Sequence, residues 1–128
     1  MKKLRSLMRI VGAIQVVLGV LYLVVPHRFL AWMGHSAVAA DIAYPLGMLS
    51  SRFLVYGALM ILAARDPENH RLLITGMVIM QLIDLAVGMY YTLDGVVALS
   101  LSAFPMFNAV WIAALLWWWR PAKAPAAS

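Results

Sequence analysis

The sequence predicts an all-α fold, an integral membrane four-helix bundle with a short interfacial helix between the first and second spans. Of the 128 residues, 65% are hydrophobic and only 12% are charged, whereas about a quarter of the residues in ordinary soluble domains are charged. Mean hydropathy is +0.89, and apolar runs long enough to cross a bilayer recur four times. Basic residues flank these runs without forming a stripe on a polar face, which indicates orientation in a lipid bilayer and argues against nucleic-acid binding.

The first predicted span covers about residues 10–25 and ends at Pro26. A basic segment precedes it and carries Lys2, Lys3, Arg5 and Arg9. A cleaved signal peptide is the alternative, because Ala-Val-Ala at residues 37–39 resembles a small-residue cleavage site. That site lies far beyond the apolar run, and Gln15 and Gly19 suit a packed helix, so we expect the span to be retained.

The segment between the first two spans mixes basic, aromatic and aliphatic residues. This composition, at residues 27–33 before Gly34, is typical of a short helix lying in the headgroup region. Small residues at 36–44 connect it to the second span, predicted at about 46–64. A charged turn at residues 65–71 then leads into the third span.

The third span is predicted at about 72–92 and the fourth at about 96–119, with the turn signal Leu-Asp-Gly at 93–95 between them. Pro105 lacks a backbone donor, so it should break the helical pattern and kink the fourth helix near Leu101. Three tryptophans at 117–119 form an aromatic belt, and Arg120 closes the helix. We expect one four-span domain over residues 1–121 and a disordered tail at 122–128.

Four spans place most basic residues outside the helices on one side of the membrane: Lys2, Lys3, Arg5, Arg9, Arg65, Arg71, Arg120 and Lys123. Arg28 alone falls on the opposite side, and Arg52 lies within a span. The positive-inside rule therefore predicts that both termini are cytoplasmic.

A polar layer is predicted at one depth of the membrane, because each span carries a polar residue roughly 12 to 19 Å from its cytoplasmic end. Its members are Gln15, Arg52, Gln81, Asp84 and Asn108. We expect Arg52 and Asp84 to form an ion pair, since an unpaired charge at that depth costs at least ~2.5 kcal/mol. The pair is either a proton or substrate site, or a clamp that fixes helix register.

The amides of the polar layer either bind a ligand headgroup or form hydrogen bonds between helices. Aromatic residues that either line a cavity or fill the bundle are Tyr22, Tyr56, Tyr91 and Trp111. Six glycines within the spans are predicted close-packing sites: Gly12, Gly19, Gly47, Gly57, Gly76 and Gly88.

Catalytic and cofactor sites have little support in the sequence. The chain has no cysteine, and His27, His35 and His70 all fall outside the spans, so no histidine pair is placed to clamp a haem. No nucleophile with a base, glycine-rich phosphate loop or metal-ligand cluster is visible. We therefore expect no catalytic residue, no metal and no cofactor.

Two segments carry a resemblance to families of small bacterial four-span proteins. Arg-Ile-Val-Gly from Arg9 and Ser-Arg-Phe-Leu-Val-Tyr-Gly ending at Gly57 resemble the DoxX-like group. Ala-Arg-Asp-Pro-Glu-Asn-His-Arg around Asp66 and Phe-Pro-Met-Phe-Asn-Ala from Phe104 resemble the poorly characterised BphX-like membrane proteins. The resemblance implies a four-helix protein of the bacterial inner membrane and carries over no catalytic residue.

Two functional hypotheses follow from these observations. The first is a non-enzymatic accessory subunit, or a binder of a lipid-like or hydrophobic small molecule through the polar layer. The alternative is a small proton-coupled transporter that uses Asp84 and Arg52. The partners implied are the lipid bilayer, a hydrophobic small molecule or a larger membrane complex, and a second copy of the chain in a homo-oligomer, but no nucleic acid.

Overall fold

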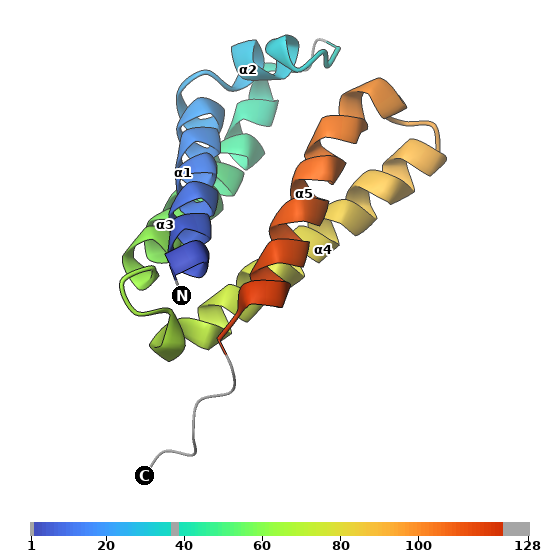
Figure 1. Ribbon diagram of the computed structural model, residues 1–128. Coiled ribbons are helices and arrows are strands. Elements are labelled where there is room, and N and C mark those ends of the chain that lie inside the picture. Colours follow the sequence, from blue (N-terminus) through green and yellow to red (C-terminus); the bar gives the residue numbers. More distant parts are fainter. Residues whose placement is uncertain (1, 37–38, 122–128) are drawn as a thin grey trace. The chain divides into compact units, whose positions relative to one another are not determined.

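The computed structural model describes residues 2–36 and 39–121, and its regular elements are all helical (Figure 1). In chain order these are α1 (Lys2–Val24), α2 (Pro26–Trp32), η1 (Ala40–Ile42), α3 (Ala43–Ala63), η2 (Pro67–His70), α4 (Arg71–Leu93) and α5 (Leu99–Trp119). The all-α prediction is confirmed, as is the short helix between the first and second long helices. Most of the Ala-Val-Ala segment and the predicted disordered tail, at 37–38 and 122–128, lie outside the described residues.

Four of the described helices are long and apolar enough to cross a membrane, and they identify a multi-pass membrane protein. Helices α1, α3 and α4 begin before the predicted spans do. α1 begins at Lys2, so the basic segment predicted to precede the first span is itself helical. This agrees with basic side chains lying in the interface at a helix end.

The α4–α5 connection was predicted from Leu-Asp-Gly, and the structure confirms a turn there. Gly95 has φ +80°, a conformation that side chains with a Cβ rarely adopt. The amide groups of Val96 and Val97 both donate to Tyr91 O, at 3.0 and 3.2 Å. These bonds hold the chain in the turn, and α5 therefore begins at Leu99 rather than at the predicted Val96.

Pro105 lies inside α5 without interrupting it, because the helix continues from Leu99 to Trp119. The missing amide affects one helical bond only, the one that Leu101 O would accept. The helix therefore continues through Pro105, and the kink near Leu101 stays a prediction.

The described residues form two compact units. Residues 9–62, which hold most of α1 together with α2 and α3, are called the α1–α3 unit. Residues 2–8 and 63–121, which hold the start of α1 with α4 and α5, are called the α4–α5 unit.

Glycine lets two backbones approach closely within the α1–α3 unit. A Cβ added to Gly12 would lie 2.6 Å from Gly57 O, and one added to Gly57 would lie 2.7 Å from Gly12 O. Gly19 packs in the same way against Leu54. Small residues at a helix crossing are a main source of packing in membranes, so these glycines bring α1 and α3 together.

An aromatic cluster joins α2 to both long helices of the α1–α3 unit. Tyr22 of α1 contacts Phe29 of α2 edge-on, with 4.9 Å between ring centroids, and stacks on Phe53 of α3 at 5.8 Å. Phe29 is buried, whereas the polar residues His27 and Arg28 are exposed. α2 is therefore amphipathic, as expected for the interfacial helix that the sequence predicted.

Helices α4 and α5 lie side by side and form the second unit (Figure 1). Near the turn, a Cβ on Gly88 would lie 2.8 Å from Met106 Cγ, and the hydroxyls of Thr92 and Ser102 are hydrogen-bonded at 2.6 Å. At the far end, Arg71 Nε donates to Pro121 O at 3.0 Å. The hairpin is thus fastened at both ends.

Candidate functional site

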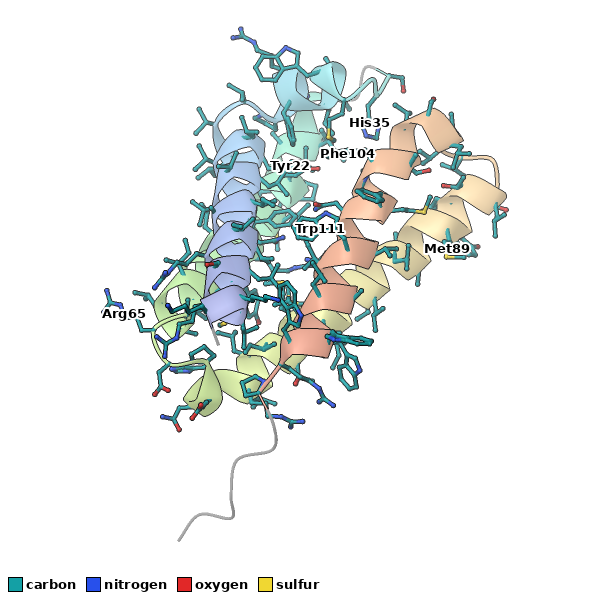
Figure 2. The ribbon with its side chains drawn as sticks, viewed as in Figure 1. Tyr22, His35, Arg65, Met89, Phe104 and Trp111 are labelled. Carbon is teal, nitrogen blue, oxygen red and sulfur yellow. The ribbon has the colours of Figure 1, made fainter. Side chains whose placement is uncertain are left out.

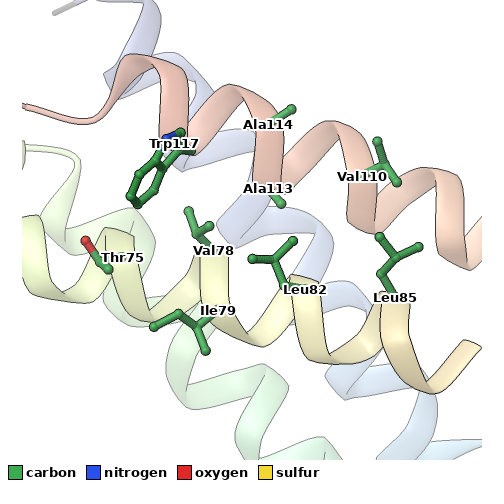
Figure 3. A pocket seen from close by; sticks show the side chains of 9 residues that line it. All are labelled: Thr75, Val78, Ile79, Leu82, Leu85, Val110, Ala113, Ala114 and Trp117. Carbon is green, nitrogen blue, oxygen red and sulfur yellow. The ribbon is translucent and has the colours of Figure 1, made fainter.

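An apolar groove runs between α4 and α5 and has a volume of about 660 Å³ (Figure 3). Its lining residues recur at the spacing of one helix face on each helix. They are Thr75, Val78, Ile79, Leu82 and Leu85 on α4, and Val110, Ala113, Ala114 and Trp117 on α5.

The groove owes its depth to small residues and is open along one side. Val78 and Ala113 are 4% and 5% exposed and form its floor, whereas Leu82 and Trp117 are each 50% exposed and form its walls. Trp117 and Thr75 lie at one end, and Leu85 faces Val110 at the other (Figure 3). The groove is therefore accessible from its open side without separation of the two helices.

The chemistry of the lining favours hydrocarbon. Thr75 carries the only side-chain hydroxyl in the groove wall, and this hydroxyl donates to Arg71 O at 3.0 Å within its own helix. The remaining lining consists of aliphatic side chains and one indole ring. A volume of this size lies in the range of ligand sites in proteins, about 300–1,000 Å³.

Cations gather at the tryptophan end of the groove. The Arg120 guanidinium carbon lies 3.5 Å from the centroid of the Trp117 ring, and Lys3 Nζ lies 6.0 Å from that of Trp119. Arg71 is held at the same end by its bond to Pro121 O. Trp119 does not line the groove, so we call Arg71 and Arg120 the basic rim.

Three members of the predicted polar layer lie in the α4–α5 unit, and their environments differ. Gln81 is buried, and its Nε2 donates to Met77 Sδ at 3.5 Å. Asp84, three residues later on α4, is exposed. Asn108 accepts a hydrogen bond at 3.0 Å from Nε1 of Trp111, on its own helix α5.

The other two members lie in the α1–α3 unit, where Gln15 is buried and Arg52 is partly buried. The Arg52 guanidinium carbon lies 5.8 Å from the Phe53 ring centroid, beside the aromatic cluster. Because Arg52 and Asp84 belong to different units, their ion pair stays a prediction.

The predicted cavity-lining residues have several environments. Tyr22 packs within the aromatic cluster, and Trp111 donates a hydrogen bond to Asn108. Tyr56 and Tyr91 are exposed, and Tyr91 contacts Tyr90 edge-on at 5.2 Å. None of the four lines the α4–α5 groove.

Arg65, which is not a member of the predicted polar layer, extends away from the ribbon near the end of α3 (Figure 2).

Sequence reasoning missed the groove residues. It assigned Trp117 to an aromatic belt and Arg120 to a helix end, and it gave no role to the neighbouring alanines. The available signal was two small residues, Ala113 and Ala114 at i+3 and i+4, between the bulkier Val110 and Trp117 at i and i+7. Such a pattern indicates a hollow only when the opposing helix is also known.

Among the described residues, no three side chains of histidine, cysteine, aspartate or glutamate are grouped to hold a metal ion. Comparison of the chain with protein-family models, curated proteins and solved structures found no match. Its site must therefore be interpreted from its own geometry.

Proposed function

We propose that this multi-pass membrane protein is a non-enzymatic binder of a lipid-like molecule in the bacterial inner membrane, with both termini cytoplasmic. It would act alone, as a homo-oligomer or as an accessory subunit of a larger membrane complex. The cytoplasmic placement of the termini is supported by the basic residues that flank the spans. Membership of the DoxX-like or BphX-like group is part of this proposal and is supported only by the segments quoted above.

The observation that carries the proposal is the α4–α5 groove. The Thr75 hydroxyl in its lining is already hydrogen-bonded to Arg71 O, so the lining offers a ligand mainly aliphatic contacts. The open side of the groove suits a ligand that is dissolved in the bilayer. The polar layer would then orient the helices around the ligand or contact a polar end of it, with Arg52 and Asp84 as the ion pair. Neither role requires a reactive group.

The test is to fill the groove. Ala114 is exposed and lines it, so Ala114→Leu places three extra carbon atoms in the hollow without enlarging the buried floor. We expect the purified variant to retain several-fold less tightly bound lipid-like material than the wild type, measured by extraction and mass spectrometry after detergent washing.

The matched control is Ala103→Leu. Ala103 is also exposed on α5 but does not line the groove, so the wild-type amount of ligand should remain. Equal retention by both variants, or a wild-type protein that retains nothing, would refute the proposal.

One observation favours the alternative, a proton-coupled transporter. Asp84 is an exposed carboxylate on a helix that is apolar enough to span the membrane. Charged groups at such positions often belong to proton or substrate pathways. In proteoliposomes that contain a pH-sensitive dye, this hypothesis predicts a proton flux that Asp84→Asn abolishes. The absence of any flux with the wild type, or the same flux with the variant, would exclude it.

A further inference from the structure

We infer that the α4–α5 groove holds one acyl chain of an anionic phospholipid, and that the basic rim binds its phosphate. This inference rests on the proposed function and adds the chemical class of the ligand. Three observations carry it: the position of the cations, the length of the groove and the charge balance at its mouth.

The position of the cations links the rim to the groove. Trp117 forms the end wall of the groove and also carries the Arg120 guanidinium over its ring, at 3.5 Å from the centroid. A guanidinium stacked on an indole keeps its charge and is held in place by the ring. A phosphate bound to Arg120 would therefore lie where an acyl chain can run past Trp117 into the hollow.

Arg71 is fixed at the same end. Its Nε donates to Pro121 O at 3.0 Å, which orders the guanidinium at the start of α4 beside the end of α5. Arginine presents several donors in a planar fork that matches a phosphate group. Two ordered guanidiniums thus flank the tryptophan end of the groove.

The length of the groove matches one leaflet. Thr75 and Leu85 are its first and last lining residues on α4, and they are separated by roughly 15 Å of helix. Half of a hydrocarbon core of ~30 Å is also about 15 Å. A lipid with its phosphate at the basic rim would therefore lay its chain along the groove within a single leaflet.

The charge balance at this end selects an anionic headgroup. In the described part of the α4–α5 unit, the basic residues of segments 2–8, 63–71 and 120–121 are Lys2, Lys3, Arg5, Arg65, Arg71 and Arg120. The acidic residues of the same region are Asp66 and Glu68, and Asp66 already accepts a hydrogen bond from Asn69. Each cation near a membrane surface favours an anionic lipid by about fivefold.

The test uses the full chain in nanodiscs that contain equal amounts of phosphatidylglycerol and phosphatidylcholine. Lipid that survives detergent washing is identified by mass spectrometry. We expect severalfold enrichment of phosphatidylglycerol on the wild type. Arg120→Gln should lower that enrichment about fivefold while the total amount of bound lipid stays nearly unchanged, because the apolar groove is intact.

Two further variants make the result interpretable. Arg28→Gln removes an exposed arginine of α2, outside the basic rim, and should leave the enrichment unchanged. Arg120→Lys keeps the charge and should restore most of the enrichment. Bound lipid without enrichment, or equal losses in Arg120→Gln and Arg28→Gln, would overturn the headgroup assignment alone. A wild type that retains no lipid would overturn the proposed function as well.

Discussion

At the scale of single residues, the glycines of the α1–α3 unit give the clearest prediction. A Cβ at Gly57 would lie 2.7 Å from Gly12 O and 2.9 Å from Val16 N, and both atoms belong to the backbone of α1. Backbone cannot move aside as the end of a side chain can. Gly57→Ala should therefore lower the free energy of unfolding by about 1–3 kcal/mol, measured by thermal or denaturant unfolding in mild detergent.

The control for this prediction lies on the same helix. Gly47 has no neighbour among the described residues within 4 Å of an added Cβ. Gly47→Ala should be neutral or stabilising by up to about 1 kcal/mol, because alanine is the better helix former. If the two substitutions changed stability equally, close packing at Gly57 would not hold α1 against α3.

The sequence could predict residue chemistry better than residue contacts. Close packing is confirmed at Gly12, Gly19, Gly57 and Gly88 but is wrong at Gly47 and Gly76, which have no neighbour among the described residues within 4 Å of an added Cβ. A glycine shows that another helix can pack closely at its position. The register of the facing helix decides whether a residue actually lies there. The hydrogen bond between Asn108 and Trp111 could have been expected, because residues three apart in sequence lie next to each other on a helix surface.

At the scale of elements, hydropathy and turn chemistry were sufficient for the helices but not for all of their ends. The four long helices, α2 and the turn at Gly95 follow directly from apolar run length and from the residues that end a helix. The start of α5 could not be predicted in this way, because the Val96 and Val97 amides donate hydrogen bonds to Tyr91 O. Such hydrogen bonds depend on the conformation of the turn and cannot be predicted from apolar residue types.

Hollows between elements were also beyond sequence reasoning. The part of α5 after Asn108 is apolar on every side, so the face that carries Ala113 and Trp117 could not be distinguished from the others. The groove appears only when α4 places Val78 and Leu82 opposite those residues. For the same reason, Trp117 was predicted as a membrane anchor and not as a wall of a binding site.

At the scale of the whole molecule, membrane residence is the most secure conclusion. It is supported both by composition and by four described helices of sufficient length and hydropathy. The ion pair between Arg52 and Asp84 stays a prediction, because the two residues belong to separate units. The proposed binding role does not depend on that pair, since the groove and the basic rim lie within the α4–α5 unit alone.

The central claim is that a lipid-like molecule occupies the α4–α5 groove, and photolabelling tests it most directly. Vesicles would contain a low mole fraction of a phospholipid with a photoreactive group in its acyl chain, and labelled residues would be located by mass spectrometry. We predict labelling concentrated on Ile79, Leu82, Val110 and Ala114. Even labelling of these and of other exposed apolar residues such as Val17 and Val55 would contradict the claim, because lipid would then only surround the helices.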